Sequence, residues 1–410
     1  MLNWRDPENP LSGGAERVTL GYLGALAKRG HEVFWFANDF AGARAKVTEI
    51  EGIRILRGGG KGSSIFEARK WYRAQPKFDL VIDQIHGIPW YAPWWCGTNC
   101  VAYLHEVLGP IWDAFYRWPL NWIGKTQERW TYRLYRNVHF WTACESTRDC
   151  LRAEGVKEIS IVRYGVHTMA VPDLPEKRLP GDVDRNIGSR PNELSPSGAR
   201  GATRPTFSGD IGGLSKAGTS QTCLRLIVVS RLAPNKRIDH AIEALRVLLD
   251  RKVEATLTVV GTGEIERQLK ALAGTLPSGA VRFTGPLPEA EKDALLRESH
   301  FLLHTSQREG WGLNVIEGNA MGTPAAVYPV AGLRESTLDN RTGLVANAET
   351  PEALAQRIME VMGAEDTYQR LRHNAWERAK KFHWSVILPK ACDWLEAQAR
   401  GERRVAIPEE

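Results

Sequence analysis

The sequence has little of what marks membrane-spanning, secreted or metal-scaffolded proteins. Its 410 residues include only six cysteines, which form no paired Cys-x-x-Cys sets, so free thiols in a reducing compartment are expected rather than a disulfide framework. No apolar run reaches the roughly 18–20 residues that cross a bilayer. Residues 1–16 are polar and unlike a signal peptide. We therefore expect a cytoplasmic protein.

The composition is that of a globular protein with an excess of positive charge. Hydrophobic residues make up 43% and charged residues 25% of a chain long enough for two domains. The formal net charge of +6 favours anionic partners such as diphosphates, nucleic acid or an acidic membrane surface. No nucleic-acid-binding module and no stripe of alternating aromatic and basic residues is recognisable, which argues against a nucleic-acid partner.

Strand-like and helix-like segments alternate in two series, which predicts an α/β fold with two doubly wound, Rossmann-like domains facing a cleft. Between the two series the chain is dense in Pro, Gly, Ser, Asp and Arg and lacks periodicity, so this stretch is expected to be disordered. The predicted division is an N-terminal domain at 1–170, a low-complexity linker at 171–223, a C-terminal domain at 224–380, and a final helix at 381–400.

The first strand of the N-terminal domain is predicted to be truncated. Doubly wound domains open with a buried strand that leads into the first glycine loop, yet only Met1 to Trp4 precede the sequence RDPENPLSGG. Either this strand is very short or the natural start lies upstream. We favour the upstream start.

The most informative segment is REGWGLNVIEGNAMGTP, residues 308–324. Glycines allow backbone N–H groups to approach a ligand closely, and the start of the following helix adds partial positive charge, so the segment suits a diphosphate or sugar hydroxyls. Glu309 and Glu317 flank this loop. A structural alternative exists for Glu317, because Asn314 as N-cap with Glu317 three residues later would form a capping box.

Two further segments of the C-terminal half suit an anionic ligand. Arg231 and Lys236 follow a strand, where an Arg can bind a diphosphate with two hydrogen bonds and a Lys as a compact charge. Gly261 and Gly263 form a Gly-x-Gly turn after the next strand. A dinucleotide-binding fingerprint would need glycine where Glu266 stands, which argues against a dehydrogenase.

In the N-terminal half, Gly13 and Gly14 precede a helix within SGGAE, and His105 stands at a strand end within VAYLHEVLG. A glycine pair ahead of a helix is another place where backbone amides can meet a phosphate. A lone histidine is more often structural, so the role of His105 stays open between structure and catalysis.

The segment 308–324 resembles the paired-glutamate signature of the retaining glycosyltransferases of family 4, which have the GT-B fold. The resemblance implies that Glu309 contacts hydroxyls of the donor sugar and that Glu317 contacts the nucleotide ribose. Backbone amides of the loop would hold the sugar and diphosphate; these loop residues are Gly310, Trp311, Gly312 and Leu313.

The segment around Arg231 and Lys236 is similar to the same family, in which such cations bind the donor phosphates and stabilise the departing nucleotide. The family implies that Gly13 and Gly14 approach the donor phosphate, that His105 lies near the reacting sugar, and that Gly261 and Gly263 lie beside the nucleotide. The sequence departs from the family pattern in three places: Ser230 and Arg237 replace glycines, and RYGVH at 163–167 replaces Asn-Gly-Val-Asp.

The resemblance implies an enzyme of the hexosyltransferase type that moves a sugar from a nucleoside-diphosphate sugar to a hydroxyl acceptor with retention. The implied reaction needs no metal and no cofactor. Two alternatives stay open: a sugar-nucleotide epimerase or phosphorylase on the same scaffold, and a catalytically silent nucleotide-sugar-binding protein. The tryptophan-rich stretch at 90–122 is either an acceptor platform, a surface that touches the inner face of a membrane, or ordinary aromatic packing.

Overall fold

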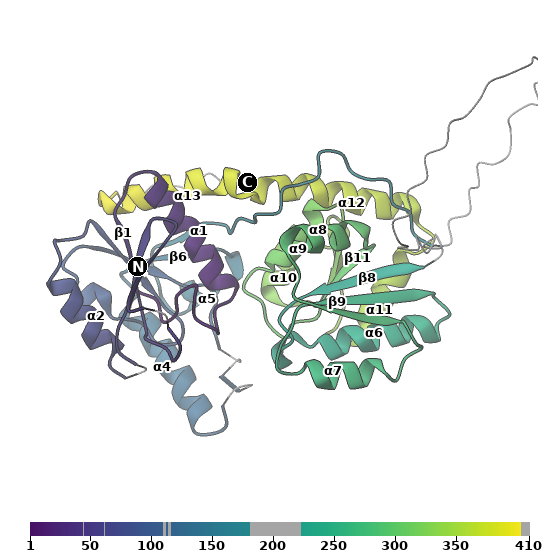
Figure 1. Cartoon of the computed structure of the whole chain (residues 1–410), viewed down its shortest axis with the longest axis horizontal. Helices are drawn as coiled ribbons and strands as arrows, with labels where there is room; N and C mark the ends of the chain where they lie inside the picture. Colours follow the sequence, from purple (N-terminus) through teal and green to yellow (C-terminus); the bar gives the residue numbers. More distant parts are fainter. Residues whose placement is uncertain (44, 61, 110–111, 114–115, 181–222, 403–410) are drawn as a thin grey trace, which may run out of the picture.

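The computed structural model describes residues 1–43, 45–60, 62–109, 112–113, 116–180 and 223–402. The greater part of the predicted linker, residues 181–222, lies outside the described residues. Figure 1 shows two α/β domains side by side, each with a central sheet covered by helices on both sides. The predicted α/β fold with two doubly wound domains is confirmed.

The N-terminal domain contains two groups of strands and five helices within the described residues. β1 and β3 pair in parallel with β2 antiparallel at the edge, and β4, β5, β6 and β7 pair in parallel in that order. The elements are α1 (Gly14–Lys28), β1 (Val33–Ala37), β2 (Val47–Ile50), β3 (Ile53–Arg57), α2 (Ser64–Arg73), β4 (Leu80–Gln84), η1 (Ala92–Trp94), β5 (Asn99–Tyr103), α4 (Leu120–Leu134), β6 (His139–Thr142), α5 (Glu145–Ala153) and β7 (Ile159–Ile161).

Leu2 occupies the place of the predicted first strand. It bridges in parallel to Phe36 at the end of β1 and to Asp83 in β4, and so joins the two groups of strands. Its N–H donates to the carbonyl of Ile82, and its carbonyl accepts from the N–H of Gln84. The strand is thus reduced to one bridging residue, as the shortness of the segment before SGGAE predicts. The upstream start stays a prediction.

The C-terminal domain is built on one parallel sheet in the order β10-β9-β8-β11-β12-β13. Its elements are β8 (Leu224–Val229), η2 (Pro234–Lys236), α6 (Ile238–Asp250), β9 (Ala255–Val260), α7 (Glu266–Ala273), β10 (Val281–Gly285), α8 (Glu289–Glu298), β11 (Phe301–His304), α9 (Leu313–Ala320), β12 (Ala325–Val327), α10 (Ala331–Ser336), β13 (Gly343–Val345), α11 (Pro351–Val361), α12 (Glu365–Ala379), η3 (Lys380–Phe382) and α13 (Trp384–Ala399).

The last helix returns to the N-terminal domain. Figure 1 shows α12 over the C-terminal domain and α13 running on over the N-terminal domain, and α13 packs against α1. The Trp384 ring lies against Gly21 and Gly165, where an added Cβ would come within 3.0 Å and 2.4 Å of ring atoms. The absence of side chains at these two glycines therefore allows the indole ring to pack between α1 and the interdomain turn. Trp384 acts as a packing residue.

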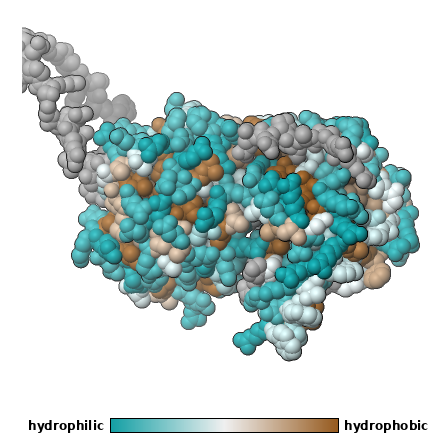
Figure 2. Space-filling view, turned by 180° about the vertical axis from the view of Figure 1, so that it is seen from behind, coloured by the Kyte–Doolittle hydropathy of each residue, from teal (hydrophilic) through white to brown (hydrophobic). Residues whose placement is uncertain are grey.

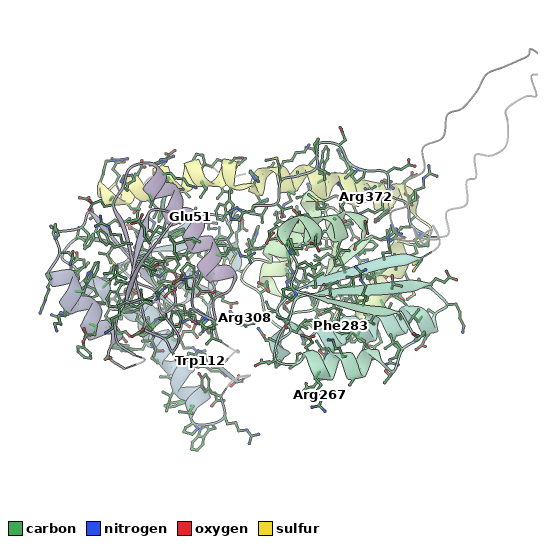
Figure 3. The ribbon with its side chains drawn as sticks, in the orientation of Figure 1. Glu51, Trp112, Arg267, Phe283, Arg308 and Arg372 are labelled. Atoms are coloured by element: carbon green, nitrogen blue, oxygen red, sulfur yellow. The ribbon has the colours of Figure 1, made fainter. Side chains whose placement is uncertain are left out.

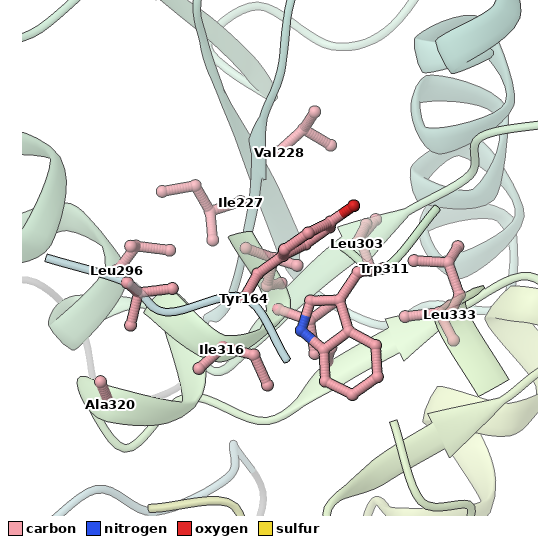
Figure 4. Packing of buried hydrophobic residues seen from close by; sticks show 14 of the residues in the cluster. Tyr164, Ile227, Val228, Leu296, Leu303, Trp311, Ile316, Ala320 and Leu333 are labelled. Carbon is pink, nitrogen blue, oxygen red and sulfur yellow. The ribbon is translucent and has the colours of Figure 1, made fainter. Parts of the chain in front are cut away.

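A single hydrophobic core continues from one domain into the other. Trp311, which is 1% exposed, packs with Tyr164 and Leu333 in this region (Figure 4) and lies 5.5 Å from the Phe382 ring. Residues from both domains thus share one apolar interior beneath the interdomain face. Burial of this surface favours a defined arrangement of the two domains.

Residues 171–180 of the predicted linker lie against the C-terminal domain. The N–H of Val171 donates to the carbonyl of Ala320 at 3.0 Å, and the ammonium of Lys177 donates to the carbonyl of Ser299 and to the Thr323 hydroxyl. Residues 171–180 therefore belong structurally with the C-terminal domain.

Candidate active site at the domain interface

The strand order of both sheets explains why the predicted site residues meet. β8 lies between β9 and β11, so the segments that follow β8 and β11 diverge to opposite sides of the same sheet edge. Arg231 and Lys236 follow β8, and Glu309 follows β11. In the N-terminal domain, Leu2 lies between β1 and β4, and the loop with Gly13 and Gly14 follows it. A place where the connections from two neighbouring strands leave to opposite sides of the sheet is a topological switch point. Both domains thus present glycine loops or charged side chains at a switch point.

Glu309 and Lys236 form the centre of the C-terminal part of the site. The Lys236 ammonium lies 2.7 Å from Glu309 Oε2, and His304 Nε2 lies 3.4 Å from the same oxygen. Burial opposes ionisation of Glu309, but the charge of Lys236 and the hydrogen bond from His304 outweigh it and lower the pKa of this carboxyl. Glu309 is therefore ionised at neutral pH and can accept hydrogen bonds from hydroxyl groups.

The sequence reasoning missed His304. This side chain is 5% exposed and comes from the last residue of β11, at the same sheet edge as Lys236. The signal available in the sequence was a histidine at the carboxyl end of a strand, where site residues of a doubly wound domain gather.

The loop from Gly310 to Leu313 runs between the two domains. A Cβ on Gly310 would lie 3.3 Å from the carbonyl oxygen of His105, and a Cβ on Gly14 would lie 3.7 Å from a methyl of Leu313. Gly312 has a φ of 89° and is the N-cap of α9. The side chain of Trp311 points into the shared core, so its contribution to a ligand site is limited to its backbone.

The capping box predicted for Asn314 and Glu317 is wrong. α9 begins at Leu313, so Asn314 lies inside the helix, and its side-chain amide donates to the carbonyl of Val229 at 2.8 Å. Glu317 accepts from the ammonium of Lys292 on α8 at 2.9 Å. The glycine in the left-handed conformation starts the helix two residues earlier than the capping pattern implies.

Arg231 and the two glycines after β9 lie beside each other. Arg231 is exposed, and within the described part of the chain its guanidinium has no hydrogen bond or ion pair. A Cβ on Gly261 would lie 2.0 Å from the carbonyl oxygen of Ser230, and one on Gly263 would lie 2.2 Å from that of Leu232. Both glycines are therefore required for the packing of these loops, whether or not they also touch a nucleotide.

His105 is held by partners from its own domain. Its Nε2 lies 3.0 Å from the Gln84 side-chain nitrogen, and its Nδ1 hydrogen-bonds the Tyr164 hydroxyl. Since the nitrogen of the Gln84 amide can only donate, His105 Nε2 accepts, and the neutral ring carries its proton on Nδ1. Burial lowers the pKa of His105 to about 3, with a smaller contribution from His86, so the ring is neutral at pH 7.

Arg308 connects the two domains next to His105. Its guanidinium lies 3.1 Å from the Glu106 carboxylate and donates to the carbonyl of Leu108 at 2.9 Å. Figure 3 shows Arg308 in the region where the two domains face each other. Burial raises the pKa of Glu106, against the opposing charge of Arg308. The sequence reasoning did not assign Arg308, although it directly precedes Glu309.

A second contact between the domains involves Glu335 of α10. Its two carboxylate oxygens accept from the N–H groups of Glu145 and Ser146, each at 2.7 Å, at the start of α5. Arg163 lies 3.2 Å from the same carboxylate and also donates to the carbonyl of Ala143. Arg163 directly precedes the positions of RYGVH that align with Asn-Gly-Val-Asp, and it supplies an ion pair between the domains.

Within the described ranges, no group of three or more His, Cys, Asp or Glu side chains is placed to hold a metal ion. Nor does any described helix combine the length and apolar character needed to cross a membrane.

Two family models match the chain. Residues 12–169 match the model described as Glycosyltransferase Family 4, and residues 216–378 match the model described as Glycosyl transferases group 1. The two matches cover both domains and the predicted site. The chain belongs to the family-4 type of glycosyltransferases.

Among curated proteins, the D-inositol 3-phosphate glycosyltransferase of Streptomyces coelicolor is 26% identical over 257 residues, covering 60% of this chain and 52% of that protein. The poly(glycerol-phosphate) alpha-glucosyltransferase of Bacillus subtilis is 28% identical over 160 residues, covering 38% of this chain and 24% of that protein. The alignments with the first two curated relatives span about half the length of those proteins, 44% and 52%.

Solved structures confirm the GT-B fold. Sucrose-phosphate synthase from Thermosynechococcus elongatus superimposes with a TM-score of 0.69 at 17% identity, over 95% of this chain and 94% of that one. Anabaena HepE in complex with UDP-glucose superimposes with a TM-score of 0.66 at 15% identity, over 97% and 98% of the two chains. At these identities the similarity concerns the fold alone.

Proposed function

We propose that this glycosyltransferase moves a hexosyl group from a nucleoside-diphosphate sugar to a hydroxyl acceptor with retention of anomeric configuration. The observation that carries the proposal is the Lys236–Glu309 pair at the switch point of the C-terminal sheet, opposite the glycine loop of the N-terminal domain. A related fold holds UDP-glucose. Glu309 would accept hydrogen bonds from the donor sugar, and Glu317 would accept them from the ribose.

Departure of the nucleotide is the step for which the site supplies positive charge. Lys236 and the exposed Arg231 follow the same strand, β8. Preorganised cations of this kind offset the charge that develops on a diphosphate leaving group. A donor would compete with Glu309 for Lys236, because the ammonium would then contact phosphate oxygens. We propose that these cations take the role that a divalent metal has in other transferases, and that no cofactor takes part.

Retention is supported by the state of the carboxylates at the interface. A double-displacement mechanism needs a carboxylate free to attack the sugar. Glu106 is paired with Arg308, and in the proposed complex Glu309 accepts hydrogen bonds from hydroxyls of the donor sugar. Neither carboxylate is placed as a free nucleophile, which favours attack by the acceptor on the face that the nucleotide leaves. The His105 imidazole, with its nitrogens bonded to Gln84 and Tyr164, would border the sugar rather than exchange protons with it.

The experiment is a thermal-shift and turnover screen against UDP-, GDP- and ADP-sugars, with analysis of the products. We expect one donor class to stabilise the protein and to be hydrolysed slowly without an acceptor. We also expect a chelator of divalent metal ions to leave the rate of transfer unchanged. Free sugar phosphate or an epimerised donor as the product would instead support a phosphorylase or an epimerase, and stabilisation without turnover would support a silent binding protein.

The matched variant is Glu309→Gln, which keeps the size of the side chain and removes its charge. We expect transfer to fall at least about 100-fold, since a hydrogen bond to a charged group contributes about 1.5–3 kcal/mol and Lys236 also loses its partner. Glu377→Gln, which removes an exposed carboxylate on α12, should keep the wild-type rate. A fully active Glu309→Gln variant would overturn the assignment.

We also propose a peripheral contact between α4 and the cytoplasmic face of a membrane. Trp118 is 80% exposed, and Leu120, Trp122, Ile123 and Trp130 are each about half exposed or more. One side of the helix carries residues spaced by three or four positions, namely Trp122, Thr126, Arg129, Trp130 and Arg133. Figure 2 shows this helix projecting below the rest of the molecule, with few strongly hydrophilic residues at its tip.

The charges around this projection favour an anionic surface. Arg117, Arg133 and Arg136 are exposed, whereas the neighbouring Asp113 is paired with Lys125 and the Glu128 carboxylate is buried. Tryptophan and basic side chains together suit the headgroup region of anionic lipid. Not all tryptophans of the stretch serve this role, because Trp90 is fully buried and stacks on Trp4.

Flotation with vesicles tests the membrane contact. We expect the protein to float with vesicles containing anionic lipid, more weakly at high salt, and the double variant Trp118→Ala/Trp122→Ala to bind at least about tenfold less. Phe66→Ala, at an exposed aromatic of α2, is the matched control and should bind as the wild type does. Equal binding of the double variant and the wild type would contradict the proposal.

A further inference from the structure

Lys292 of α8 lies in a cluster of carboxylates next to Glu317. Its ammonium lies 2.5 Å from Glu289, 2.9 Å from Glu317 and 3.8 Å from Asp293. The side chain of Lys292 is 7% exposed and that of Glu317 is 13% exposed. The ion pair between Lys292 and Glu317 is therefore largely buried, unlike a typical surface ion pair.

The position of Lys292 on its helix is unusual for a lysine. Leu296, one turn further along α8, is fully buried, and Ser299 ends the same face near the carboxyl-terminal turn of α9. A lysine is costly on such a face unless its charge is paired. Burial lowers the pKa of Lys292, but Glu317 and Glu289 outweigh it and raise the pKa overall, so the side chain is charged.

The backbone around Glu317 is fixed, whereas its carboxylate depends on Lys292. α9 is anchored at its start by Gly312, and the Asn314 amide is tied to the carbonyl of Val229. Among the described residues, Lys292 is the one side chain that donates a hydrogen bond to the Glu317 carboxylate. The carboxylate keeps a second oxygen for another donor.

Removal of Lys292 would leave three carboxylates close together. Glu289, Asp293 and Glu317 would then repel one another or take up protons, because like charges at short distance disfavour ionisation. Among the described residues, Glu289 forms one other ion pair, with Arg17 of α1 at 3.7 Å, but both of those side chains are more than half exposed. This weak pair cannot replace the buried ammonium.

We propose that Lys292 is a positioning residue that holds the Glu317 carboxylate in the orientation needed to accept hydrogen bonds from the ribose hydroxyls of the donor. The inference rests on the proposed function, in which Glu317 contacts the ribose. Lys292 itself would not touch the donor. It would set how strongly the protein distinguishes a nucleotide with ribose hydroxyls from one without them.

The test compares binding of UDP, GDP and ADP with binding of their 2′,3′-dideoxy counterparts by calorimetry. We expect the wild type to bind one of the natural diphosphates about 10- to 100-fold more tightly than its dideoxy form, as for a hydrogen bond to a charged acceptor. In Glu317→Gln and in Lys292→Met this ratio should fall to within about threefold of unity. Affinity for the dideoxy form should change less than about threefold, because the contacts to the base and phosphates remain.

Two further variants separate positioning from general stabilisation. Lys292→Arg keeps the charge and should restore at least part of the ratio, even if Lys292→Met folds poorly. Lys380→Met, which removes an exposed ion pair with Glu377, should leave the ratio unchanged. A wild-type ratio in Lys292→Met, with only the unfolding temperature lowered, would overturn the inference.

The failure of the proposed function would look different. If the wild type binds none of the three diphosphates, the proposed function fails and the inference fails with it. If the wild type binds a diphosphate but does not distinguish the dideoxy form, the proposed function stands and the ribose role of Glu317 and Lys292 is refuted.

Discussion

Arg237 adopts a left-handed backbone conformation at a position where the family pattern has glycine. It has a φ of 46° and a ψ of 48°, the left-handed conformation in which residues other than glycine are strained. Its guanidinium donates to the carbonyls of Thr305 and Ser306 and pairs with Glu349. These bonds tie the loop after β8 to the loop after β11, and they offset the strain. The departure from glycine therefore does not disrupt the site.

At the same scale, His105 makes the stability of the protein depend on pH. Its pKa is lowered from 6.5 to about 3 in the folded chain, so the unfolded chain binds a proton that the folded chain does not between these values. The contribution of His105 to stability is complete above pH 6.5 and is lost as the pH falls towards 3. We expect it to decrease by about 2 kcal/mol between pH 6.5 and pH 5.

Chemical denaturation at several pH values measures this effect. In His105→Gln, the free energy of unfolding should decrease less steeply below pH 6.5 than in the wild type, since glutamine does not titrate. His373→Gln, at an exposed position of α12, should keep the slope of the wild type. Parallel curves for His105→Gln and the wild type would refute the lowered pKa.

At the scale of elements, the glycine turn after β9 depends on the loop after β8. The space for a side chain at Gly263 is closed by the carbonyl of Leu232, whereas Gly274 at the end of α7 has no atom closer than 3.4 Å to an added Cβ. This turn therefore cannot move without also moving the loop that contains Arg231 and Lys236. The two loops act as one unit at the edge of the sheet.

Gly263→Ala should consequently disturb both loops. We expect it to lower the free energy of unfolding by about 1–3 kcal/mol, because a backbone clash cannot be relieved by a rotamer change. Affinity for the donor diphosphate should fall at least about tenfold. Gly274→Ala is the matched control, and we expect its stability and affinity to stay near those of the wild type. An unchanged Gly263→Ala variant would contradict the close approach of the loops.

At the scale of the whole molecule, three kinds of contact set the arrangement of the domains. Trp384 and Trp311 belong to the shared core, Arg308 contacts the segment after β5, and Glu335 binds the start of α5. The Glu335 side chain is 17% exposed, and its carboxylate faces the positive end of helix α5. It is therefore the polar contact best placed to stabilise this arrangement.

We expect Glu335→Gln to weaken the contact between the domains by about 1–2 kcal/mol, since the charge and one acceptor are lost at a helix start. The domains should then separate more readily, which small-angle scattering would detect as a larger radius of gyration. Glu360→Gln, on α11 away from the N-terminal domain, should leave the radius unchanged. An unchanged radius and unfolding temperature in Glu335→Gln would show that the apolar core alone holds the domains.

The sequence by itself determined the fold class and indicated the residues that are proposed to bind the donor. Alternating strands and helices have distinct periodicities, and the glycine loops and charged residues follow strands directly, so local pattern sufficed to predict two doubly wound domains and to single out Lys236 and Glu309. These features depend on neighbours in the chain.

Only the tertiary structure decided which distant side chains pair. Lys292 and Glu317 are on different helices, and Glu335 and the start of α5 are 190 residues apart. The structure also replaced the predicted capping box, because the start of α9 is set by the left-handed Gly312 and by the bond from Asn314 to β8. Such contacts depend on strand order and domain packing, which fix distances that no local pattern contains.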